Sequence, residues 1–239
     1  MKTDRCLFIL MFVLLGIATG SAQSTARYEL DVKDFTELMV TDGINVDYKS
    51  NSDSVGKAVF QASSDIASVI MFSNNGKQKL EIKLAETEAP MEYKNLPTVT
   101  IYSKFLTKVT NRGDSTVRVL SVSPGPNFKA QLEGNGRLVV RDIDTNSVEG
   151  SIFTGNGVLV INGKCSSAKL NNKGVGSIQA DGLDAEMVKC VQIGTGYVGC
   201  SASKELTIYG ASGKVYYKGS PLIKNRSIGI KVFSLDSEE

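Results

Sequence analysis

The chain has 239 residues, of which 27 are lysine or arginine and 25 are aspartate or glutamate, so its formal net charge at pH 7 is +2. Nucleic-acid-binding proteins need a dense basic face, and this nearly balanced charge argues against one. The sequence contains no histidine, which excludes the usual Ser-His-Asp and Cys-His catalytic groups and any imidazole metal ligand. We therefore expect no metal and no cofactor.

Residues 1–23 have the three-part pattern of a secretory signal peptide. Lys2 and Arg5 give a basic start, residues 7–18 are almost entirely apolar, and small residues follow. The apolar run is shorter than the roughly 20 residues that span a bilayer core. Cys6 precedes this run, so we expect no lipid anchor, and no later apolar stretch is long enough for a transmembrane anchor. We expect export, to the periplasm, the outer surface or the medium.

Residues 24–125 read as a strand-rich region. Short alternating segments such as "KAVFQA", "KLEIKL" and "TVTIYS" are separated by turn signals such as "NSDS" and "NNGK". Between them, "SSDIASVIMF" predicts one short helical turn that Ser63 or Ser64 caps. The region forms either a small sheet of its own or irregular first turns of the repeats that follow.

The segment "DGINVDY" opens one of these strands. We expect Gly43 to permit a turn, after which Ile44, Val46 and Tyr48 face one side of the strand. Asn45 is then either exposed or bonded to a neighbouring strand.

Residues 126–239 repeat a Gly-x-Gly motif followed by alternating apolar residues, as in "EGNGRLVV" and "TGNGVLVI". The second glycines stand at 136, 157, 176, 196 and 213, in steps of 21, 19, 20 and 17 residues. A period near 20 with strand-like alternation predicts an all-β, right-handed parallel β-helix of about 20 residues per turn. The glycines are best explained as tight corners, because no helix follows them as a phosphate-binding loop requires. Residues 126–239 then supply the turns and the closing strands.

Tyr197, Tyr209, Tyr216 and Tyr217 gather near the C-terminal repeats. Tyrosine rings suit sugar stacking or protein contact, although they also fill the outer faces of strands in many β proteins. These four residues are the candidate binding residues that the sequence offers.

The acidic residues permit an enzymatic alternative. Asp142 and Asp144, and likewise Asp181 and Asp184, could supply the carboxylates of a polysaccharide lyase or hydrolase. The residues around them look like solvated corners, and the acids do not recur at matching positions as a stacked Ca²⁺ ladder requires. We therefore assign no catalytic residue.

Three cysteines follow the signal peptide: Cys165, Cys190 and Cys200. The odd number leaves at least one thiol free. We favour three buried thiols over a Cys190–Cys200 or Cys165–Cys190 bridge. An "RGD" triplet at residues 112–114 is interpreted as a turn around its glycine.

Three features together resemble the head GIN domain family of auto-transporter-like adhesins from Bacteroides-type bacteria. They are "DGINVDY" at residues 42–48, the Gly-x-Gly repeats, and the closing "VYYKGSP" at residues 215–221. The resemblance runs from about Tyr28 to Leu235. The tail "LIKNRSIGIKVFSL" departs from the family pattern, because such families often carry more glycine before the last strand. This departure bears only on the shape of the last turn.

The resemblance implies a secreted, non-enzymatic, adhesin-like binding module that presents a β-helix face to glycans or proteins at the cell surface. The alternatives are the carbohydrate-active enzyme above and a periplasmic structural protein that assembles through its open ends. A homo-oligomer is compatible with each of these functions.

Overall fold

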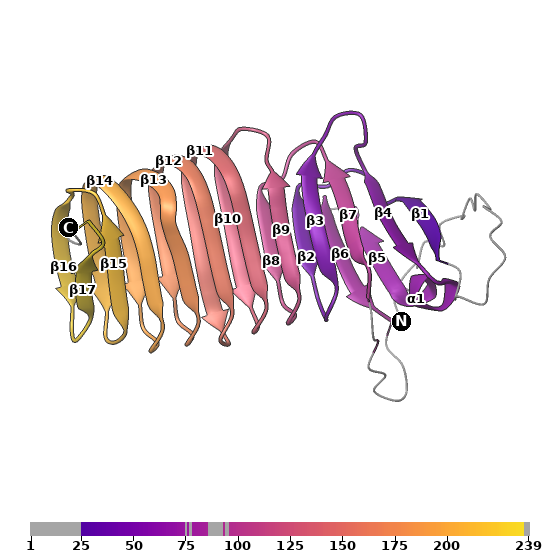
Figure 1. Ribbon diagram of the computed structural model, residues 1–239. Helices are drawn as coiled ribbons and strands as arrows, with labels where there is room; N and C mark the ends of the chain where they lie inside the picture. Colours follow the sequence, from indigo (N-terminus) through magenta and orange to yellow (C-terminus); the bar gives the residue numbers. More distant parts are fainter. Residues whose placement is uncertain (1–24, 75, 77, 86–92, 94–95, 237–239) are drawn as a thin grey trace, which may run out of the picture.

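The structure is a computed structural model that describes residues 25–74, 76, 78–85, 93 and 96–236. It is 68% strand and 3% helix, and the strands stack into an elongated solenoid of about 6 turns that follow one another roughly every 20 residues (Figure 1). The parallel β-helix predicted from the Gly-x-Gly repeats is thus confirmed. The signal peptide expected at residues 1–23 lies outside the described residues.

The elements follow one another as β1 (Ala26–Asp31), β2 (Glu37–Val40), β3 (Asn45–Ser50), β4 (Lys57–Ala62), α1 (Ser64–Val69), β5 (Ile70–Asn74), β6 (Lys79–Leu84), β7 (Thr98–Ser103), β8 (Lys108–Asn111), β9 (Thr116–Ser121), β10 (Gly125–Glu133), β11 (Arg137–Thr154), β12 (Val158–Asn172), β13 (Ser177–Gln192), β14 (Tyr197–Gly210), β15 (Lys214–Lys218), β16 (Leu222–Ser227) and β17 (Lys231–Ser234).

The strands form two faces, which we call the first sheet and the second sheet. The first sheet runs β1-β4-β7-β3-β9, continues through the opening segments of β11 to β14, and ends in β15 and β17. The second sheet runs β5-β6-β2-β8-β10, continues through the closing segments of β11 to β14, and ends in β16. The long strands β11 to β14 bend from one sheet to the other, so each turn contributes to both.

Strands of the N-terminal region belong to these same two sheets. The pair β8 and β9 stacks directly on β10 and β11, and β2 and β3 stack on β8 and β9. The turn β6–β7 lies beyond β2–β3, so the stacking order differs from the chain order. Of the two expected arrangements, the structure shows irregular first turns rather than a separate sheet.

The core lies between the two sheets and is built from inward-facing positions of every turn. Leu138, Leu159, Ile178 and Val198 are in-register neighbours on the first sheet, and all are fully buried. Burying a side chain of this kind contributes about 1.5–3 kcal/mol relative to leaving it in water. The period-two alternation seen in the sequence is therefore the alternation between core and surface.

The "DGINVDY" segment partly departs from expectation. Ile44, Val46 and Tyr48 face the core as predicted, with no exposed surface. The left-handed turn residue, however, is Asp42 (φ 66°) and not Gly43. The expected turn is present at residues 42–43, but Asp42 takes the positive φ, which an aspartate also tolerates, and its carboxylate accepts a hydrogen bond from the Leu84 N–H (2.9 Å).

Asn45 faces outward in this segment. Its side-chain oxygen accepts a hydrogen bond from the Thr116 backbone N–H at 2.9 Å. Thr116 belongs to β9, the strand that pairs with β3. Of the two expectations for Asn45, the bond to a neighbouring strand is therefore the correct one.

The Gly-x-Gly corners require glycine for the steric reason that the sequence suggests. A Cβ placed on Gly194 would lie 1.7 Å from the Gly174 carbonyl oxygen, and one on Gly196 would lie 1.8 Å from that of Gly176. Successive corners stack backbone on backbone, so a side chain there would push neighbouring turns apart.

The two ends of the solenoid differ. At the N-terminal end, the antiparallel strands β1, β4 and β5 flank helix α1, whose Ile66 and Ala67 pack against the core. Ser63 occupies the N-cap position of α1, but its side chain makes no capping hydrogen bond, so the predicted cap is wrong in this respect. At the C-terminal end, β16 pairs with β14 and β17 with β15, and neither has a second partner strand among the described residues (Figure 1).

Candidate functional site

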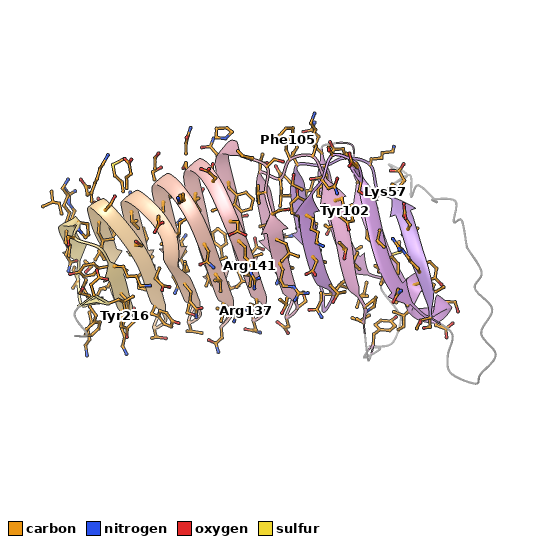
Figure 2. The ribbon with its side chains drawn as sticks, turned by 45° about the horizontal axis from the view of Figure 1, so that its top comes forward. Lys57, Tyr102, Phe105, Arg137, Arg141 and Tyr216 are labelled. Atoms are coloured by element: carbon orange, nitrogen blue, oxygen red, sulfur yellow. The ribbon has the colours of Figure 1, made fainter. Side chains whose placement is uncertain are left out.

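The candidate site is a row of aromatic rings on the outer surface of the first sheet, near its C-terminal end. Tyr197, Tyr216 and Phe233 come from β14, β15 and β17. The ring centroids of Tyr197 and Tyr216 are 5.7 Å apart with the planes at 88°, and those of Tyr216 and Phe233 are 5.3 Å apart with the planes at 22°. We call these residues the aromatic ladder. Figure 2 labels Tyr216 at the C-terminal end of the solenoid, well separated from Lys57 and Tyr102 near the other end.

Strand register explains why the rings meet. Tyr216 is the in-register neighbour of Phe233 on one side and of Gly199 on the other. Because Gly199 has no side chain, Tyr197 and Tyr216 can make contact diagonally across it. On the preceding strand, the Gln179 amide donates a hydrogen bond to the Tyr197 hydroxyl at 2.9 Å, which fixes the orientation of that ring.

Charged side chains border the aromatic ladder. Lys218 forms an ion pair with Asp181 at 3.1 Å, close to Gly199. Lys214 and Lys231 are exposed on the same outward face as the rings, each two residues before an aromatic residue in its strand. The ladder therefore combines apolar ring surface with hydrogen-bonding and cationic groups at its edges.

This combination suits recognition of a flat, partly polar ligand. Phe233 is 43% exposed, and both tyrosines are half-buried, so their rings are held in place and still present surface to the solvent. Aromatic faces stack on the C–H faces of sugars or on protein side chains, while the edge groups provide hydrogen bonds. In the described part of the chain, no cluster of three or more His, Cys, Asp or Glu residues could hold a metal ion.

The four tyrosines predicted from the sequence do not all lie on one surface of the structure. Tyr197 and Tyr216 lie together, whereas Tyr217 points inward and packs against the core. Tyr209 lies on the second sheet, where the Lys189 ammonium is 4.9 Å from its ring centroid and Arg226 is its in-register neighbour. All four lie near the C-terminal turns, but strand alternation and the two sheets place them on different surfaces.

Phe233 was not among the predicted site residues. The sequence nevertheless contains a signal for it, because "KVYY" at residues 214–217 is followed 17 residues later by "KVFS" at residues 231–234. This step repeats the one between the preceding Gly-x-Gly motifs. Aligning the two segments would have placed Phe233 beside Tyr216, as the register now does.

The four candidate acids have different surroundings. Asp142 has a left-handed backbone (φ 52°) at a corner where the register shifts. Lys164 is in register with Asp144 on one side and Asp184 on the other, so a cation separates these acids. Asp181 is paired with Lys218. The solvated-corner interpretation therefore fits the structure, and the enzymatic one gains no support from it.

The three cysteines are free and buried, as favoured from the sequence. The sulfur atoms of Cys190 and Cys200 are 3.9 Å apart inside the core. Burial raises the pKa of the Cys165 thiol to about 11. The hydrogen bond between Cys190 and Cys200, together with burial, raises the pKa of the Cys190 thiol. Because the thiolate is the reactive form, neither Cys165 nor Cys190 is placed to act as a nucleophile.

The "RGD" triplet forms a corner around its glycine, as predicted. A Cβ on Gly113 would lie 1.6 Å from the Asp42 carbonyl oxygen, so only glycine fits. The Arg112 side chain is 2.7 Å from Glu133, and the Asp114 carboxylate accepts a hydrogen bond from the Asn135 N–H.

Two hollows elsewhere on the surface are less suited to ligand binding. One of about 480 Å³ lies near the N-terminal end, and the one aromatic residue among its described lining residues, Phe60, is 3% exposed. The other, of about 200 Å³, is mainly apolar and is lined by residues that include Phe105 and Phe128. Small-molecule pockets usually have volumes of roughly 300–1,000 Å³, so the second hollow is small for such a role.

Comparison with known proteins agrees with this architecture. The family model described as "putative auto-transporter adhesin, head GIN domain" matches residues 34–221. A search of curated proteins finds no match. Among the residues that the structure describes, there is no helix of the length and apolarity needed to cross a bilayer.

Solved structures of several bacterial proteins share the fold. A "putative adhesin" from Bacteroides fragilis has a TM-score of 0.78 and 21% identity, covering 90% of this chain and 98% of its own. A "putative adhesin" from Parabacteroides merdae has a TM-score of 0.69 and 18% identity, covering 88% and 96%. A "putative lipid binding protein" from Parabacteroides distasonis has a TM-score of 0.71 and 16% identity, also covering 88% and 96%. At these identities, the likeness shows the fold alone.

Proposed function

The chain belongs to the head GIN domain family, and on this premise we propose that it is an exported, non-enzymatic, adhesin-like module that binds a glycan through its aromatic ladder. The observation that carries the proposal is the row of ring contacts at 5.7 and 5.3 Å on an outer face. Core packing does not require these rings, because Val198 and Val215 supply the inward positions of the same strands.

A rigid scaffold supports this function. The ladder spans neighbouring parallel strands, which lie about 4.8 Å apart and are held by continuous hydrogen bonding. Side chains on such strands lose little conformational freedom when a ligand binds, which favours affinity. A solenoid face also lets a polymer contact several turns at once. A protein ligand would use the same rings, and it is the alternative outcome of the experiment below.

A lipid ligand is the second candidate, suggested by the name of the Parabacteroides distasonis protein. The mainly apolar hollow near Phe105 and Phe128 is the place for it. At about 200 Å³ this hollow is below the usual range for ligand pockets. The glycan proposal is therefore the stronger one.

The test is a glycan array probed with residues 24–239, in calcium and in EDTA. We expect saturable binding to a related set of glycans that is the same in both buffers. The Tyr216→Ala/Phe233→Ala variant should weaken this binding at least tenfold, which corresponds to about 1.4 kcal/mol. Tyr209→Ala removes the same kind of ring from the second sheet and should leave binding unchanged.

Two results would contradict the proposal. An array without signal would remove glycans as the ligand class and direct the search to proteins. Binding that survives in the ladder variant but is lost in Tyr209→Ala would move the site to the second sheet.

A further inference from the structure

We infer that the glycan is acidic, and that Lys214 and Lys231 bind its carboxylate or sulfate groups beside the aromatic ladder. This inference rests on the proposed function and adds the chemical class of the ligand. Lys214 and Lys231 are in-register neighbours on β15 and β17, and both side chains are exposed. On the same two strands Tyr216 and Phe233 are also in register. Two parallel columns result, one cationic and one aromatic.

The cationic column is unfavourable without a partner. Like charges directly opposite each other on adjacent strands are destabilising. Within the described residues, neither Lys214 nor Lys231 takes part in an ion pair. Two described acids in this part of the first sheet are already engaged: Asp181 pairs with Lys218, and Asp236 accepts a hydrogen bond from the Gly219 N–H. An anionic ligand would supply the missing counter-charge.

A second pair of neighbouring lysines differs from Lys214 and Lys231 in that its charges have partners within the protein. Lys169 and Lys189 are also in-register neighbours. There, however, Lys169 is 3.4 Å from Glu149, and Lys189 lies over the Tyr209 ring. Each of those charges is thus satisfied within the protein. Lys214 has Tyr197 as its other neighbour, and Lys231 lies on the edge strand.

The dimensions of a β-sheet suit one sugar unit per turn. Residues two apart on a strand are separated by about 6.6 Å, and neighbouring strands by about 4.8 Å. A sugar ring stacked on Tyr216 or Phe233 can therefore place an acidic substituent above the adjacent lysine column. Lysine side chains are long and flexible, so the same column can meet carboxylates or sulfates. The shared requirement is an anionic group on a pyranose ring.

The experiment compares polymers of the same backbone with and without anionic groups. Polygalacturonate is paired with its fully methyl-esterified form, and dextran sulfate is paired with dextran. Affinities for residues 24–239 are measured by titration at low and at physiological salt. We expect each anionic polymer that binds to bind at least tenfold more tightly than its neutral partner, with affinity falling as salt rises. Binding of one anionic polymer alone would identify carboxylate or sulfate as the group recognised.

The decisive variant is Lys214→Gln/Lys231→Gln, with Lys108→Gln/Lys129→Gln as its matched control. The control pair is also in register, lies on the second sheet and removes the same charge, while Glu149 keeps its contact with Lys169. We expect the first variant to lose at least tenfold in affinity for the anionic polymer, and the control to change less than twofold. Equal losses in both variants would mean diffuse attraction to net charge and would overturn the inference.

The outcomes also separate this inference from the proposed function. If neutral and charged polymers bind equally and only the Tyr216→Ala/Phe233→Ala variant weakens binding, the glycan site stands and its acidic preference is wrong. If none of the four polymers binds and the glycan array is also without signal, both proposals fail.

Discussion

A buried amide is predicted to hold the first Gly-x-Gly-like corner in place. Asn111, at the end of β8, has no exposed surface. Its side-chain nitrogen donates to the Ser115 carbonyl oxygen at 2.9 Å and to that of Arg137 at 3.2 Å, and its oxygen accepts from the Gly113 N–H at 3.1 Å. One side chain thus ties the corner at residues 112–115 both to itself and to the next turn.

The substitution Asn111→Ala removes these three hydrogen bonds and leaves the Gly113 N–H without its acceptor. Each bond has a net value of about 1 kcal/mol, so the loss in the free energy of unfolding should be about 3 kcal/mol. For a domain of this size, 1 kcal/mol lowers the melting temperature by roughly 2–4 °C, which gives a decrease of roughly 6–12 °C.

The measurement is urea unfolding of residues 24–239, followed by circular dichroism, with thermal unfolding alongside. Asn146→Ala is the control, because Asn146 is exposed on β11 and its substitution should cost less than about 0.5 kcal/mol. The midpoint of the Asn111→Ala variant should fall with little change in the denaturant slope. Equal stability of the two variants would refute the idea that buried amides hold the corners.

Three further predictions concern the core. Gly196→Ala places a Cβ 1.8 Å from the Gly176 carbonyl oxygen and should lower the free energy of unfolding by at least about 1–3 kcal/mol. Gly125→Ala is the control, because the nearest atom to its Cβ is 4.0 Å away and the free energy of unfolding should change little. Burial raises the pKa of Tyr48 above its ordinary value, so its stabilising contribution is present below about pH 10 and is lost as the pH rises through the folded-state pKa. Tyr48→Phe should therefore unfold less steeply with rising pH in alkaline titrations. Because burial raises the pKa of Cys165 to about 11, the native protein should resist alkylation at pH 8. A thiol titration after unfolding should find all three cysteines that follow the signal peptide. A lower number would demonstrate a disulfide.

The local patterns of the sequence were sufficient to predict the solenoid. Alternation with period two distinguishes core from surface within a strand, and Gly-x-Gly marks the positions where one backbone lies against another. Each feature involves only a few residues, and its recurrence at steps near 20 residues makes the solenoid readable from a single sequence. The burial of Ile44, Val46 and Tyr48 follows from the same rule.

Only the tertiary structure decided which strands are neighbours. The placement of β2–β3 between β6–β7 and β8–β9 depends on long-range pairing, and alternation within a strand does not specify the partner. The aromatic ladder depends on this register as well, because Tyr216 meets Phe233 from the next turn while the adjacent Tyr217 turns into the core. The sequence by itself therefore determined that the chain winds into a β-helix with candidate aromatic residues, and the stacking of its turns decided which of them share a surface.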